Sequence, residues 1–212
     1  MATRRFNNAA EWVHGLGDVP LERIVFDPLP GTATEQDVLD LADHKDRLVE
    51  LVGGTLIEKP PGFSEAVVAT HLICAVSEFV RPRRLGVVTG GAGPIRMACG
   101  HVRLPSAVFV SVDDLPGGKI PREPIPTLPP RFAAEVLRAG NTKAEMRVKL
   151  KEYFESRTRL AWIVDPRERT VAVYDGPTED PVRTLDKRCT LDGGGVFAGF
   201  TLPVADLFVQ MP

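Results

Sequence analysis

The chain has 212 residues, 43% of them hydrophobic and 25% charged, which is enough for one sizeable core. A formal net charge of −2 argues against a protein that coats nucleic acid through bulk charge. The apolar runs stop short of the roughly 18 residues that a membrane helix needs, and no signal peptide follows the basic start, so we expect a cytoplasmic protein without a membrane span. Three cysteines without a Cys-x-x-Cys pair indicate neither a disulfide framework nor a zinc knuckle.

The N-terminal part divides into an extension and the start of a main domain. Residues 1–32 mix polar and apolar positions with three prolines and read as an extension, and 33–212 as the domain itself. A helix is expected from about Thr34, because a capping threonine is followed by acidic residues. The stretch "RLVELVGGTLIEK" (47–59) predicts a β-hairpin that turns at its Gly-Gly pair.

The middle of the chain alternates helix and strand signals. Residues 64–80 carry apolar side chains at helical spacing and predict a helix that Pro82 ends. Residues 85–111 read as three strands separated by glycine turns. Residues 113–130 form a proline-rich loop that is too long for a tight connection and is a candidate flap.

The stretch "RFAAEVLRAGNTKAEMRVKLKEYF" (131–154) places Glu135 in a short strand that otherwise reads as buried. A helix follows, with Thr142 as its cap, and 160–176 predict a further hairpin before short C-terminal strands. The expected fold class is therefore α/β in the α+β sense: a mixed sheet with helices on its faces and C-terminal β-hairpins.

Glu135 is the main candidate for chemistry, because a buried carboxylate needs a cation, a donor network or a metal. Strand alternation puts it on the face opposite Phe132. On the next helix, Lys149 is the lysine nearest the buried side, whereas Lys151 points away. This Glu–Lys arrangement suits a bound Mg²⁺ with an activated water, and it also suits a purely structural ion pair.

Other chemistries have weaker support. The glycine-rich "GGAGPI" (90–95) lacks the Gly-Lys-Ser/Thr of a P-loop, the four histidines show no pair at metal-ligand spacing, and no serine lies in a nucleophile elbow. Basic charge does gather around Glu135: residues 131–159 have a net charge of +4, and "RPRR" occupies 81–84. That charge indicates either a solvated helix face or a surface for DNA phosphates.

The succession "RLVELVGGTLIEKP", "VRLPSAVFVS", "AAEVLRAGNTKAEMRVKLKEYFES", "LAWIVDPRERTVAVY" and "TLDGGGVFAGFTLPVADLF" resembles the small Uma-type putative restriction endonuclease family of the PD-(D/E)xK nuclease superfamily. The likeness runs from about residue 33 to the end. It implies a restriction-endonuclease-like αβββαβ core and hydrolysis of DNA phosphodiesters with Mg²⁺ or Mn²⁺.

The resemblance also assigns roles. Glu135 is expected as catalytic residue and metal ligand, Lys149 as the lysine displaced onto the helix, and Glu50 as a supplementary acid. Ser106 stands where the family has the aspartate of its Pro-Asp motif, so it is a weak metal ligand and the metal site is degraded. We expect Ser106, Glu135 and Lys149 to converge at a sheet edge, and Ser106→Asp to strengthen metal binding.

The implied DNA contacts are basic residues around one cleft, and pairing of subunits into a homodimer is plausible by analogy with the superfamily. These contacts are Arg138, Lys143, Arg147 and Arg83. Three hypotheses stay open: a metal-dependent DNA endonuclease, an inactive DNA-binding or protein-interaction module on the same fold, and a structural module that only uses the Glu–Lys pair.

Overall fold

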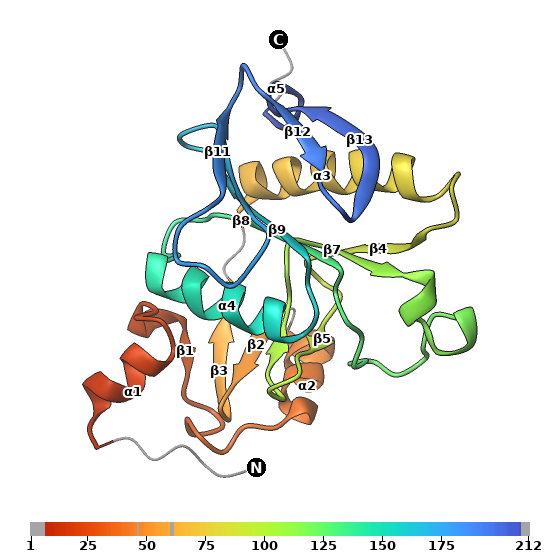
Figure 1. Ribbon diagram of the computed structural model, residues 1–212. Helices are drawn as coiled ribbons and strands as arrows, with labels where there is room; N and C mark the ends of the chain where they lie inside the picture. The colour runs from red at the N-terminus through yellow and green to blue at the C-terminus, as the bar shows by residue number, and fades with distance from the viewer. Residues whose placement is uncertain (1–6, 46, 60–61, 209–212) are drawn as a thin grey trace.

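The computed structural model describes residues 7–45, 47–59 and 62–208. Helix α3 covers one side of the six-stranded sheet. Helix α4 lies between that sheet and a five-stranded sheet near the N-terminus, called the smaller sheet below (Figure 1). The helices are α1 (Ala9–Gly15), α2 (Glu35–Lys45), α3 (Phe63–Val80), α4 (Lys143–Glu155) and α5 (Val204–Leu207), with 3-10 turns at Leu21–Arg23, Val112–Asp114 and Pro116–Gly118.

Three sheets make up the β-structure. Their orders are β11-β10-β9-β8-β7-β4, β1-β3-β2-β6-β5 and β12-β13; β8 and β9 run parallel and the other neighbours antiparallel. The strands are β1 (Ile24–Val25), β2 (Val49–Val52), β3 (Thr55–Glu58), β4 (Gly86–Gly90), β5 (Ile95–Arg96), β6 (Val102–Arg103), β7 (Ala107–Ser111), β8 (Phe132–Val136), β9 (Leu160–Asp165), β10 (Thr170–Tyr174), β11 (Arg183–Asp186), β12 (Thr190–Gly193) and β13 (Phe197–Pro203).

The succession α3, β4, β7, β8, α4, β9 has the order αβββαβ, which confirms the predicted core and the α/β fold class. Strand β8 shows why the two faces differ. Its residues Phe132, Ala134 and Val136 join α3 and the C-terminal hairpin in the main apolar cluster. Ala133 faces the other way and packs with Tyr153 of α4. Glu135 shares that second face, because side chains alternate along a strand.

Local signals locate most elements. The β2–β3 hairpin turns at Gly53 and Gly54, whose φ angles of 55° and 75° suit glycine. Thr142 caps α4 by accepting a hydrogen bond from the backbone N–H of Glu145 at 2.9 Å. The prediction of three strands over 85–111 was wrong, since four form there; β5 and β6 have two residues each and join the smaller sheet.

The segment before α2 is integrated into the fold from Gly17 onward. Strand β1 pairs with β3 and so extends the smaller sheet. Gly17 packs on the first turn of α4, where an added Cβ would lie 2.5 Å from the Cα of Glu145. The Thr142 hydroxyl donates to the Gly17 carbonyl at 2.5 Å. The N-terminal segment therefore buttresses the start of α4.

Within the described residues, α3 is the one helix long and apolar enough to cross a membrane, with a mean hydropathy of 1.5 over 18 residues. The sequence-based expectation rested on uninterrupted apolar runs, whereas this value averages the hydropathy over the whole helix. In the structure Leu72, Val76 and Val80 of α3 pack into the main cluster beside the sheet.

Candidate functional site

Glu135 lies in the interior of the six-stranded sheet, on the face that α4 covers. The sequence had predicted a position at a sheet edge, which was wrong because β8 has a neighbouring strand on each side. Ala107 of β7 pairs with Ala134 of β8, and continuing that antiparallel register by one residue sets Ser106 opposite Glu135. The Ser106 hydroxyl donates to Glu135 Oε2 at 3.3 Å and accepts from the backbone N–H of Val136 at 3.0 Å. Both side chains are buried.

Four groups meet the two oxygens of Glu135. Oε1 accepts from Lys149 Nζ at 3.1 Å and from the Tyr153 hydroxyl at 2.5 Å. Oε2 accepts from Ser106, and Lys59 Nζ lies 3.6 Å from it. Burial opposes the charge, but Lys149 and Lys59 outweigh it and hold the pKa of Glu135 below its ordinary value. Glu135 is thus a buried carboxylate ion with its charge balanced from both sides.

Lys149 joins Glu135 to a second carboxylate. Its ammonium donates to Glu50 Oε1 at 2.8 Å, so β2 of the smaller sheet and β8 of the larger one meet at this lysine. Burial disfavours the ammonium, yet Glu135 and Glu50 together raise the pKa of Lys149 above its ordinary value. Helical spacing explains the placement, because Lys149 and Tyr153 are four residues apart and lie on one face of α4.

Lys59 was missing from the sequence interpretation. It follows β3 directly, donates to the Leu104 carbonyl and is buried. Burial lowers the pKa of Lys59, and the repulsion of Lys149 adds to this effect against the attraction of Glu135. The sequence offered one weak signal, a lysine directly after a strand of mostly buried residues, and that signal does not identify Glu135 as its partner.

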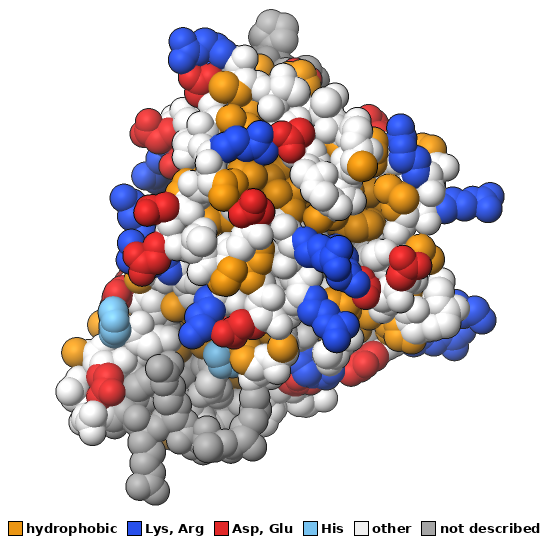
Figure 2. Space-filling model, in the orientation of Figure 1, with side chains coloured by type: hydrophobic (Ala, Val, Ile, Leu, Met, Phe, Trp, Pro, Cys, Tyr) orange, Lys and Arg blue, Asp and Glu red, His pale blue; other side chains and the backbone are white. Residues whose placement is uncertain are grey.

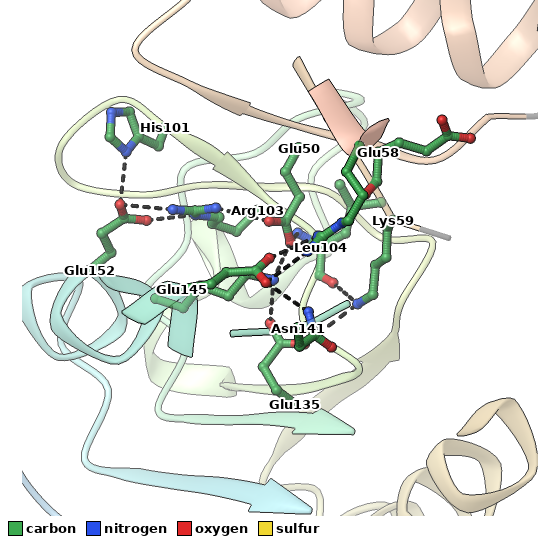
Figure 3. Close-up of polar contacts among 12 residues, drawn as sticks. Glu50, Glu58, Lys59, His101, Arg103, Leu104, Glu135, Asn141, Glu145 and Glu152 are labelled. Carbon is green, nitrogen blue, oxygen red and sulfur yellow. Dashed lines mark hydrogen bonds and ion pairs between the residues drawn. The ribbon is translucent and has the colours of Figure 1, made fainter. Parts of the chain in front are cut away.

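Ion pairs extend from this centre in two directions (Figure 3). Arg103 of β6 donates to Glu50 Oε2 at 2.9 Å and to Glu152 Oε2 at 2.6 Å, and Glu152 Oε1 meets His101 Nδ1 at 2.9 Å. On the other side, Glu145 of α4 binds Arg23 through both oxygens, each at 2.8 Å. Three segments far apart in the sequence are therefore fastened to α4.

The expected DNA contacts do not share one surface. Arg138 follows β8, and Lys143 and Arg147 are exposed on α4, with Arg147 3.9 Å from Glu179. Lys143 and Arg147 line a groove of about 310 Å³ beside the end of β8. Arg83 instead follows α3 and lies over the Phe79 ring at 4.0 Å. The sequence placed Arg83 in the same cleft, which was wrong because α3 covers the opposite face of the sheet.

The expected Mg²⁺ or Mn²⁺ does not fit the donors as they are arranged. A hard divalent ion needs charged oxygens with free lone pairs. Each oxygen of Glu135 already faces two donors or cations, and the Ser106 hydroxyl is used by Glu135 and Val136. The two ammonium groups of Lys59 and Lys149 also balance Glu135 and Glu50 without a metal. The mismatch lies at Ser106, which brings no charge, and at Lys59, whose ammonium lies beside the Glu135 oxygen that accepts from Ser106.

Comparisons with known proteins agree with this fold. A family model described as putative restriction endonuclease matches residues 35–205. A solved structure of a putative nuclease belonging to DUF820 from Anabaena variabilis ATCC 29413 superposes with a TM-score of 0.66 at 19% identity, covering 77% of this chain and 90% of that one. At this identity the likeness shows the fold alone. A search of the curated proteins found no match.

Proposed function

Because the chain belongs to the putative restriction endonuclease family, we propose that it is a DNA-binding protein on a nuclease fold whose cleavage centre is closed by its own lysines. One observation carries the proposal: donors already occupy both oxygens of Glu135, and the Lys59 ammonium lies 3.6 Å from the oxygen that also accepts from Ser106. Restriction-endonuclease-like proteins usually use divalent metals, and here three hydrogen bonds and the nearby Lys59 ammonium already surround the oxygens that such an ion would need.

DNA as the partner is supported by family membership and by the exposed side of α4. Lys143 and Arg147 rise from the first two turns of that helix, and Asn141 lines the same groove. Phosphate oxygens accept from such side chains and would compete with Glu179 for Arg147. The predicted contact is with the DNA backbone, which fixes position without reading sequence.

The second candidate is the Mg²⁺- or Mn²⁺-dependent endonuclease itself. It is favoured by one specific observation: Lys149 lies within hydrogen-bond distance of both Glu50 and Glu135, the three residues to which the resemblance assigns catalytic roles. In that case the ion enters only after Lys59 leaves Glu135. Cleavage would then be metal-dependent and would disappear in Glu135→Gln.

The experiment measures binding and cleavage separately. Fluorescence anisotropy with a labelled duplex, in EDTA and over a series of salt concentrations, should show binding that weakens steeply with salt. Lys143→Glu with Arg147→Glu should weaken binding and reduce the salt slope by about two, one for each lost phosphate contact. The matched control is Lys119→Glu with Lys187→Glu, which makes the same charge change at two exposed lysines outside α4.

A supercoiled plasmid incubated with Mg²⁺ or Mn²⁺ provides the cleavage test. The proposal expects no nicking by the wild-type protein. Metal-dependent nicking that Glu135→Gln abolishes would replace the proposal with the second candidate. Absence of duplex binding at low salt, or equal weakening by both charge-reversal pairs, would reject DNA binding through α4.

A further inference from the structure

A second set of potential ligands lies about one helical turn along α4 from Lys149. Within the described residues, Cys99, His101 and Glu152 are the group of His, Cys and acidic side chains that could hold a metal, with ligand atoms all within 4.8 Å of one another. Glu152 comes from α4, whereas Cys99 and His101 come from the turn between β5 and β6. The sequence search for paired histidines and Cys-x-x-Cys spacing could not find a set divided in this way.

The turn aims its two ligands at the helix. The Met97 N–H donates to the His101 carbonyl and the Gly100 N–H to the Met97 carbonyl, both at 2.8 Å, which closes a tight hairpin. Gly100 has a φ of 84°, the left-handed region that favours glycine. Cys99 and His101 on either side of it are therefore held by backbone geometry and not by side-chain packing alone.

The ligand types favour zinc over magnesium. Thiolate and imidazole are softer donors that suit Zn²⁺, whereas Mg²⁺ prefers oxygen. His101 Nδ1 and Glu152 Oε1 are 2.9 Å apart. Two ligands about 2.1 Å from a tetrahedral zinc are roughly 3.4 Å apart, so the pair needs to open by only about half an ångström. One thiolate and one carboxylate then balance the charge of the ion.

Access and support are both present. The His101 side chain is 25% exposed, so an ion and a water molecule can reach it from solvent. Arg103 donates to Glu152 at 2.6 and 3.0 Å and fixes the direction of the carboxylate, as outer partners of metal ligands do. Without a metal, the His101–Glu152 pair holds the same groups together, so the ligands are gathered in advance.

We propose that Cys99, His101 and Glu152 bind Zn²⁺, with water as the fourth ligand, and that this site fastens the β5–β6 turn to helix α4. It is separate from Glu135, because Arg103 and Glu50 lie between the two centres. The site does not depend on whether the protein binds or cuts DNA.

The test uses Zn²⁺ and Co²⁺ as probes on the full chain. The metal-free protein should take up one Zn²⁺ per chain, measured by competition with a chromophoric chelator, and its melting temperature should rise. Co²⁺ should give the near-ultraviolet charge-transfer band of a cobalt–thiolate bond. Cys99→Ser should lose the band and weaken zinc binding by about 100-fold or more, since even outer partners account for 10–100-fold.

The control is Cys74→Ser with Cys189→Ser, which leaves Cys99 as the one thiol among the three cysteines. This variant should keep the cobalt band and the zinc affinity. The inference is overturned if the wild-type protein gives no cobalt–thiolate band, if the control loses it, or if Cys99→Ser binds zinc as tightly as wild type. DNA binding measured in EDTA does not affect this result, so the two proposals can fail independently.

Discussion

Lys59 and Lys149 each face a different oxygen of Glu135. The Lys59 Nζ lies 3.6 Å from Oε2, and the Lys149 Nζ lies 3.1 Å from Oε1. Only Lys149 was expected there, and its role was expected to be that of a cation beside a metal. Because of Lys59, the serine at position 106 is not the only feature that disfavours a metal ion. A carboxylate restored at that position would meet the Lys59 ammonium first, so a single substitution is not enough to recreate a metal site.

The first prediction follows from this arrangement. Ser106→Asp alone should bind Mn²⁺ scarcely better than wild type, because Lys59 would neutralise the new carboxylate. Ser106→Asp with Lys59→Met should bind Mn²⁺ tightly enough to saturate, since affinity for hard ions rises with the number of charged oxygens left free. Isothermal titration calorimetry measures both proteins.

Lys151→Met in the Ser106→Asp background is the matched control, because Lys151 is an exposed lysine on α4. It should leave Mn²⁺ binding unchanged. Tight binding by Ser106→Asp alone would show that Lys59 does not block the site.

The Tyr153 hydroxyl carries a second prediction. It donates to an ionised carboxylate at 2.5 Å in a buried position, and hydrogen bonds to charged groups contribute about 1.5–3 kcal/mol. Tyr153→Phe should therefore lower the free energy of unfolding by about 2 kcal/mol in urea denaturation. Tyr174→Phe, a buried tyrosine outside this network, should change it by clearly less; equal losses would contradict the assignment.

At the scale of elements, α4 joins the two larger sheets. Its Thr142 cap could be predicted from the sequence, because Thr-x-x-Glu is a local pattern. In a Thr-x-x-Glu capping box the glutamate returns to the cap, but the Glu145 carboxylate binds Arg23, 122 residues away, and Asn141. No local pattern reports such a partner, since only the folded chain brings the 3-10 turn Leu21–Arg23 next to α4.

The Arg23–Glu145 pair gives the third prediction. Breaking a buried ion pair from one side costs about 3–5 kcal/mol, because the remaining charge is left without a partner. Arg23→Met should lower the free energy of unfolding by that amount, and adding Glu145→Met should restore part of the loss. A double-mutant cycle by chemical denaturation measures the coupling; strictly additive losses would mean that the two residues act independently.

At the scale of the whole molecule, periodic and turn signals predicted a mixed sheet with helices on its faces, the two faces of β8 and the inward direction of Lys149, whereas the αβββαβ order came from the family resemblance. They failed where contacts are long-range or strands very short. Two-residue strands such as β5 carry no periodicity, and nothing near Lys59 in the sequence indicates that it faces Glu135. The same limit hid Arg103, which links Glu50 to Glu152 across 53 and 49 residues.

The buried carboxylates make the stability of the whole molecule sensitive to acid. Burial raises the pKa of Glu152, but Arg103 and His101 outweigh it and lower the pKa to about 2 from 4.5. A pKa lowered by folding stabilises the protein fully above pH 4.5, and that contribution is lost as the pH falls toward 2. For Glu152 it is on the order of 3 kcal/mol, and Glu50 and Glu135 shift in the same direction.

The fourth prediction is that the free energy of unfolding falls steeply between pH 4.5 and 2, measured by urea denaturation across that range. Glu152→Gln should be less stable at neutral pH and should show a shallower fall. An unchanged pH profile in this variant would contradict the role of Glu152.

The central claim is that the donors around Glu135 leave no place for a divalent metal. Mn²⁺ titration of wild-type protein and Glu135→Gln, followed by electron paramagnetic resonance of the free ion, tests it most directly. We predict that the two proteins give superimposable curves, because Glu135 contributes no ligand. Saturable binding of one Mn²⁺ per wild-type chain that Glu135→Gln abolishes would contradict the claim.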